Sequence, residues 1–195
     1  ILDTTVFDLQ SGLNVGGNLK VTALGITQSG PATVVGTSTF DGGAAAIVLT
    51  DANNDFTGAV SAQNTSAFSI QLVDKNAIVL GNIAMEASAA GTLSVTAGGD
   101  ITQVKDLIIP ANDATITTGT GAISLTGING SNITLFNAGN AFNAAVTFAP
   151  SVGVGNRLNN ISILDTTAIA LQSGLNVGGD LAVTALGITQ SGPVT

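Results

Sequence analysis

The side chains with which this chain could do chemistry are carboxylates, Lys and hydroxyls, because it contains no His, Cys or Tyr. Asp51 and Asp55 lie four residues apart around an Asn pair, so one turn could hold both carboxylates. Such a pair is what general acid–base cleavage of a polysaccharide or calcium binding would use. The diverged copy of this segment, residues 137–141, has lost both carboxylates. We therefore interpret the segment as a solvated turn with Asx-type hydrogen bonds.

Three other patterns also have simpler structural explanations. Gly98-Gly99-Asp100 is a short echo of calcium-binding nonapeptides, but the full repeat is not found, so turn glycines are the favoured interpretation. Lys75, next to Asn76 and upstream of the only Glu, has the residue types of an isopeptide crosslink, yet a solvent-facing Lys suffices. The Thr-x-Thr pairs at 37–39 and 115–117 are too isolated for an ice-binding array.

These comparisons predict no catalytic residue, no cofactor-binding residue and no metal ligand, and therefore a protein that is not an enzyme. The net charge of -8 argues against binding to nucleic acid or to an anionic membrane surface. Only four cations are available to contact phosphates: Lys20, Lys75, Lys105 and Arg157. The longest strongly apolar run, residues 44–49, is too short to span a bilayer, so no membrane insertion is expected. Because Ile1 is not a natural start, we expect any targeting sequence outside this fragment.

The elements that would position these residues repeat along the chain. Residues 163–195 repeat residues 1–33 at a constant offset of 162, with differences at only six of the 33 positions. The differing pairs are Val6/Ala168, Phe7/Ile169, Asp8/Ala170, Asn18/Asp180, Lys20/Ala182 and Ala32/Val194. We expect residues 1–162 to be one full repeat, residues 163–195 to begin the next, and no separate globular domain to exist.

A weaker repeat lies inside the larger one. Residues 47–60 align without gaps on residues 133–146, and residues 70–80 align on residues 161–171. The segment GTLSVTA at 91–97 echoes GNLKVTA at 17–23 and GDLAVTA at 179–185. The large repeat therefore reads as two diverged halves of 74 and 88 residues, counted between Gly17, Gly91 and Gly179.

Short segments alternate apolar and polar residues with the period of 2 that half-buried strands show. They begin at Leu19, Ile47, Ile70, Leu93, Ile123, Ile133 and Ile161. Matching Leu49, Leu72, Leu93, Ile116 and Leu135 as one ladder gives spacings of 23, 21, 23 and 19. Coils of about 20 residues fit a parallel β-helix, with seven or eight rungs per 162-residue unit.

The sequence thus predicts an all-β parallel β-helix (β-solenoid) with a core of Val, Ile, Leu and Ala. Twenty-five Gly and four Pro agree with many tight turns between short strands. A string of β-sandwich domains is the alternative architecture, although such modules usually carry a buried aromatic anchor.

The segments at residues 17–30, 53–62 and 91–103 resemble the repeat regions of giant bacterial exoproteins of the filamentous-haemagglutinin-like kind. The shared patterns are N-D-F-x-G-x-V and G-x-L-x-V-x-A-x-G-x-I-T-Q. The resemblance implies secretion to the bacterial cell surface, a right-handed shaft, and a role in adhesion, aggregation or biofilm. The long and nearly identical 162-residue unit departs from the short degenerate repeats of a typical shaft.

We therefore expect an extracellular structural repeat of a surface fibre, sheath or adhesin shaft, a stiff rod with no active site and no cofactor. Its expected partners are further copies of itself in fibres or bundles, and cell-surface or glycan contacts are possible. A carbohydrate-binding or carbohydrate-cleaving β-helix and a functional amyloid are the alternatives.

Overall fold

The computed structural model describes residues 1–87, 89–104, 114–150 and 155–195, so Lys105 lies outside the described residues. This part of the chain contains strands and turns and no helix. Sheet 1 has nine strands: β1 (Phe7–Leu9), β4 (Ile26–Gln28), β7 (Ile47–Leu49), β10 (Ile70–Asp74), β12 (Leu93–Ala97), β15 (Ile123–Gly127), β17 (Val146–Pro150), β19 (Ala168–Leu171) and β21 (Gly187–Gln190).

Two further sheets complete the coil. Sheet 2 consists of β3 (Leu19–Thr22), β6 (Ser38–Asp41), β9 (Val60–Gln63), β11 (Ile78–Ala84), β13 (Ile101–Gln103), β14 (Ile116–Thr117), β16 (Ile133–Leu135), β18 (Ile161–Leu164) and β20 (Leu181–Thr184). Sheet 3 is shorter, with β2 (Leu13–Val15), β5 (Ala32–Val34) and β8 (Asp55–Phe56).

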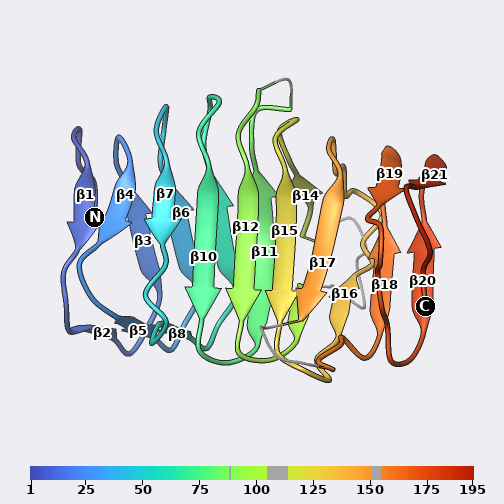
Figure 1. Ribbon diagram of the computed structural model, residues 1–195. Coiled ribbons are helices and arrows are strands. Elements are labelled where there is room, and N and C mark those ends of the chain that lie inside the picture. Colours follow the sequence, from blue (N-terminus) through green and yellow to red (C-terminus); the bar gives the residue numbers. More distant parts are fainter. Residues whose placement is uncertain (88, 105–113, 151–154) are drawn as a thin grey trace.

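The described chain is a parallel β-solenoid, as the sequence predicts. Strands pair in parallel with strands one coil before or after them in the sequence, and those inside a sheet pair on both sides. Figure 1 shows the strands side by side from β1 to β21, so the two termini lie at opposite ends of the molecule.

Apolar side chains stack into ladders inside the coil. In sheet 1, Ile47 pairs with Ile70, Ile70 with Leu93, and Leu93 with Ile123, and all four are at most 1% exposed. Small Ala side chains, including Ala62 and Ala97, are also buried. Phe also contributes to the core: four of the seven are fully buried, namely Phe40, Phe56, Phe142 and Phe148.

Residues 163–195 repeat the pairing that residues 1–33 make. Phe7 pairs with Ile26, and the equivalent Ile169 pairs with Ile188. Leu2 likewise bridges to Thr22, and Leu164 pairs with Thr184. In the order of sheet 1, β19 stands seven steps after β1. The two copies therefore occupy equivalent places in the stack.

The predicted single ladder through Leu49, Leu72, Leu93, Ile116 and Leu135 is wrong after its first step. Leu49 does pair with Leu72, but Leu72 then pairs with Val95. Ile116 and Leu135 belong to sheet 2, where they pair with Ile83 and Ile163. Coil lengths vary, with 23 residues from Ile70 to Leu93 but 30 from Leu93 to Ile123, so a fixed spacing loses the ladder.

The two halves of the larger repeat are also displaced around the coil. GNLKVTA contributes β3 to sheet 2, whereas its echo GTLSVTA contributes β12 to sheet 1. Ile47–Leu49 lies in sheet 1, and the aligned Ile133–Leu135 lies in sheet 2. The half-repeats therefore share local motifs but place them on exchanged sheets.

We expect Leu72→Ala to lower the free energy of unfolding by about 2–5 kcal/mol, because it leaves a cavity in a ladder that both neighbouring rungs share. Leu72 is 1% exposed and lies between Leu49 and Val95. The matched control is Gln71→Ala on the same strand, whose side chain is only partly buried, with an expected change within about 0.5 kcal/mol. Urea unfolding followed by circular dichroism measures both, and equal losses would contradict the inward ladder.

Candidate functional site

The turn that carries Asp51 and Asp55 uses both carboxylates locally. Asp51 Oδ1 accepts a hydrogen bond from the Asn53 N–H at 2.9 Å, which is an Asx turn. Asp55 lies on β8 and forms an ion pair with Lys75 Nζ at 2.8 Å, and it also accepts a hydrogen bond from Asn76. The ion pair with Lys75 lowers the pKa of the Asp55 carboxyl. This geometry favours the structural interpretation of the turn.

The other residues that the sequence singled out also have structural surroundings in neighbouring coils. Asp100 Oδ1 accepts a hydrogen bond from the Asn132 N–H of the next coil at 2.7 Å. A Cβ on Gly98 would collide with the carbonyl oxygen of Lys75 in the preceding coil, so Gly is needed there. Thr39 has Lys20 and Ser61 as its neighbours in sheet 2, and it stands in no row of Thr.

Side-chain amides join neighbouring coils at two places, which we call the amide clamps. In the first, Gln28 Nε2 donates to Asn54 Oδ1 (2.8 Å) and Asn54 Nδ2 donates to Gln28 Oε1 (2.9 Å). The second joins Gln103 and Asn140 in the same reciprocal way, at 2.7 and 3.0 Å. Both Asn side chains are completely buried.

Each clamp Asn also satisfies backbone groups at the ends of strands. Asn54 Oδ1 accepts from the Ala32 N–H of the preceding coil, and Asn140 Oδ1 accepts from the Ile116 N–H. Asn140 Nδ2 also donates to the Leu135 carbonyl oxygen at 3.1 Å. The clamps therefore replace strand hydrogen bonds that the turns cannot supply.

Two buried aspartates also accept hydrogen bonds from backbone N–H groups. Asp74 accepts hydrogen bonds from the backbone N–H groups of Phe56 and Asn76, at 2.9 and 2.8 Å. Asp165 accepts from the N–H groups of Phe142 and Thr167. Burial raises the pKa of the Asp74 carboxyl, while the N–H groups of Asn76 and Phe56 oppose that rise.

Sequence reasoning missed these four buried polar residues, although the internal alignment contains the signal. Aligning residues 47–60 on 133–146 places Asn54 on Asn140, and aligning 70–80 on 161–171 places Asp74 on Asp165. Retention of one polar residue in two otherwise diverged copies indicates a structural constraint at that position.

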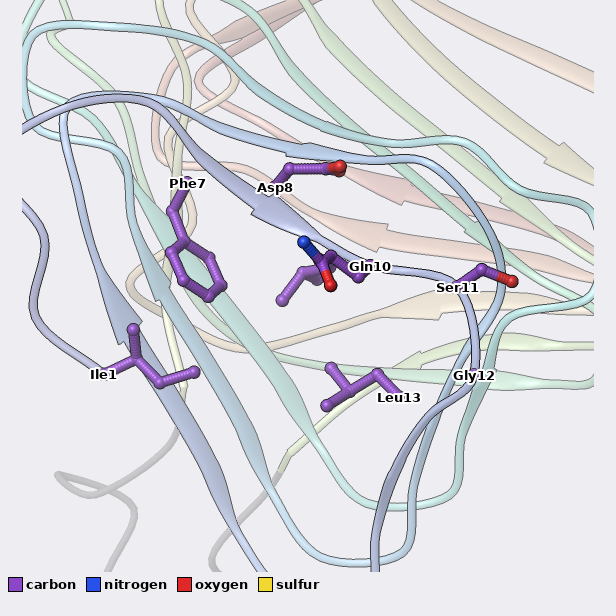
Figure 2. Close-up of a pocket in the computed structure, with 8 residues that line it drawn as sticks. Ile1, Phe7, Asp8, Gln10, Ser11, Gly12 and Leu13 are labelled. Carbon is purple, nitrogen blue, oxygen red and sulfur yellow. The ribbon is translucent and has the colours of Figure 1, made fainter.

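A hollow with a volume of about 460 Å³ lies at the N-terminal end of the solenoid. It is lined by residues 7–13 of the first coil and by Ile1. Figure 2 shows Ile1, Phe7 and Leu13 around this opening. These are core side chains that have a neighbouring coil on only one side, so the hollow is the open end of the apolar core.

The described residues hold no cluster of three or more acidic, His or Cys side chains that could bind a metal ion. Over the same ranges, no helix is long and apolar enough to cross a membrane.

Comparison with known proteins gives one match. The sequence model of a family described as repeats of unknown function (DUF5649) matches residues 2–63 and 67–149, which is most of the chain. No curated protein and no solved structure matches. The match in two consecutive segments agrees with the internal repetition of the sequence.

We expect Asn54→Ala to destabilise the protein by about 1–3 kcal/mol, because it removes both hydrogen bonds to the half-buried Gln28 amide and leaves the buried N–H of Ala32 without its acceptor. Asn54→Asp should cost more at neutral pH, because it places a carboxylate opposite Gln28 Oε1 in the first clamp. The control is Asn53→Ala in the exposed part of the same turn. Chemical unfolding of the three variants tests the clamp, and equal effects at positions 53 and 54 would refute it.

As the pH rises, titration of Asp74 should lower the free energy of unfolding, and titration of Asp55 should raise it. Because the folded-state pKa of Asp74 lies above 3.8, the free energy of unfolding falls as the pH rises from 3.8 through that raised value. Asp74→Asn abolishes this titration, so the stability lost through the substitution should shrink between about pH 3 and pH 7.

For Asp55, with its lowered pKa, the loss caused by Asp55→Asn should instead grow as the pH rises toward neutrality. Urea midpoints across this range measure both trends. A loss for Asp74→Asn that stays constant or grows would contradict the assignment.

Proposed function

The chain belongs to the family described as repeats of unknown function (DUF5649), and from this premise we propose that it is a structural repeat of a secreted surface fibre, sheath or adhesin shaft. In this role it is a stiff rod with no active site. Its function is to maintain length and spacing by stacking, and to associate with further copies.

The observation that carries this proposal is the recurrence of the same pairing in the two copies. Leu13 pairs with Ala32 in the first copy, and Leu175 bridges to Val194 in the second. Between them runs a single apolar core with no break among the described residues. A sequence that returns to an equivalent place in the stack allows the solenoid to continue copy after copy without a separate domain interface.

Three further features belong to the proposal. The array repeats every 162 residues, which the sequence identity between the two copies supports. The coil is right-handed and the protein lies at the bacterial cell surface, which the resemblance to filamentous-haemagglutinin-like exoproteins supports. Lateral contacts between rods use an uncharged stretch of the outer face of sheet 1, where Gln71, Ser94, Ser124 and Thr147 follow one another.

Electron cryo-microscopy of material sheared from the source cells tests the proposal, with an antibody raised against this chain as the label. We expect labelled continuous filaments with a rung spacing of about 4.8 Å and an axial repeat of about 34 Å, the length of seven rungs. Antibody absorbed with the purified chain is the control.

Other outcomes would assign the chain differently. Labelled stalks that end in a distinct head would make it a spacer and move the function to the head. Compact unlinked particles would contradict the fibre. In that case, glycan-array binding or polysaccharide cleavage by the purified chain would favour the carbohydrate-binding or carbohydrate-cleaving alternative.

A further inference from the structure

We propose that the outer face of sheet 2 carries a binding site for a neutral saccharide, centred on the exposed ring of Phe136. The site is a hollow of about 380 Å³, which we call the Phe136 groove. Strands β13, β16 and β18 carry it, and all three lie inside sheet 2 with a paired strand on either side. The groove is lined by Thr102, Gln103, Thr134, Phe136, Asn137 and Ser162. The inference goes beyond the fibre role, because a rod that only maintains length needs no such site.

Alternation along the three strands turns a row of hydroxyl groups outward. The first residue of each strand is an Ile that is at most 1% exposed, so the second residue points to the outer face. These second residues are Thr102, Thr134 and Ser162, and they pair with one another in register. The hydroxyl groups therefore follow one another along the axis at the rung spacing of about 4.8 Å.

Phe136 lies beside this row of hydroxyl groups. It follows Leu135, the fully buried last residue of β16, and its own side chain is 40% exposed. The fold does not need an aromatic residue at this place, because the aligned residue in the other half of the large repeat is Thr50, which is also exposed. The exposed ring is therefore a feature of this groove rather than of the solenoid.

The frame of the groove is fixed by internal hydrogen bonds. Asn137 is 2% exposed, and its Nδ2 donates to two main-chain carbonyl oxygens at 2.7 and 3.0 Å. Gln103 is held by the second amide clamp. The hydroxyl groups of Thr134 and Ser162, in contrast, form no hydrogen bond within the part of the chain that the structure describes. A rigid frame thus presents an apolar ring and two available hydroxyl groups, which lowers the entropic cost of binding.

A neutral sugar ring has the chemistry that this arrangement fits. The C–H face of a sugar can pack on the Phe136 ring, and its hydroxyl groups can donate to and accept from the protein hydroxyl groups. No side chain that lines the groove is charged, and the chain has a net charge of -8. An acidic saccharide would therefore meet repulsion and no compensating cation.

An extended peptide fits the same surface less well. Peptides that add to a sheet need an open strand edge, whereas the strands under the groove are paired on both sides. In an array, the groove would recur once in each copy of the 162-residue unit. A polymeric glycan along the rod would then be held by many weak sites at once.

Calorimetric titration of the purified chain tests the site. The probes are three neutral hexasaccharides (cellohexaose, mannohexaose and chitohexaose) and the acidic hexagalacturonate. We expect at least one neutral probe to bind and hexagalacturonate not to bind. Phe136→Ala should weaken binding about tenfold, because it removes the stacking surface, whereas Phe136→Tyr should retain it. Thr134→Val should weaken binding a few-fold, because it keeps the shape and removes one hydroxyl group.

Phe68→Ala is the matched control for loss of an exposed ring. Phe68 is 44% exposed and lies in the turn before β10, outside the groove, so this variant should bind like the unmodified chain. Circular dichroism verifies that the variants fold.

Equal losses in Phe68→Ala and Phe136→Ala would overturn the proposal, as would binding of hexagalacturonate alone or of none of the four probes. Association of the unmodified chain in sedimentation velocity, abolished by Phe136→Ala but not by Phe68→Ala, would instead assign the groove to a lateral contact between copies. Filaments on the source cells combined with a purified chain that binds no hexasaccharide would overturn this inference alone and leave the fibre role standing.

Discussion

Hydrogen bonds between successive coils are the constraint on which the rest of this structure depends. Ile26 donates to the carbonyl oxygen of Ala46, Ile47 to that of Ser69, and Ile70 to that of Thr92, at 2.9–3.0 Å. No coil can satisfy its backbone alone, because its donors and acceptors point along the axis. The apolar ladders follow from this register, since in-register parallel pairing places each inward side chain directly over the next. The amide clamps complete the same hydrogen bonding where the chain turns.

Much of this architecture could be predicted because local sequence patterns indicate it. Alternation around Ile47, Ile70 and Ile123 identified strands, and all three are buried at the first position of a sheet 1 strand. The recurrence of residues 1–33 at 163–195, with differences at only six positions, indicated stacking. Alternation and recurrence both survive variation in the turns, which is why the class of fold followed from them.

The pairing of particular coils and the buried polar residues could not be predicted in the same way. Leu93 pairs with Ile123 across a coil of 30 residues, so a fixed spacing does not identify the pairing partner of a strand. Hydrophobic alternation carries no information on the length of a turn. Asn53 and Asn54 look alike in the sequence, yet only Asn54 points into the coil and meets Gln28. That difference arises from a residue 26 positions away, which no local pattern contains.

The seven steps from β1 to β19 have a geometrical consequence for the surface of the rod. Because this number is whole, the second copy begins in the same rotational phase as the first, with Ile169 in sheet 1 like Phe7. The half-repeats instead exchange sheets, so Leu93–Ala97 lies in sheet 1 whereas its echo in Leu19–Thr22 lies in sheet 2. In an array of such units, a side chain that occurs once in each large unit would recur in a straight row along one flank of the solenoid, so a flat ligand surface could contact every copy at once.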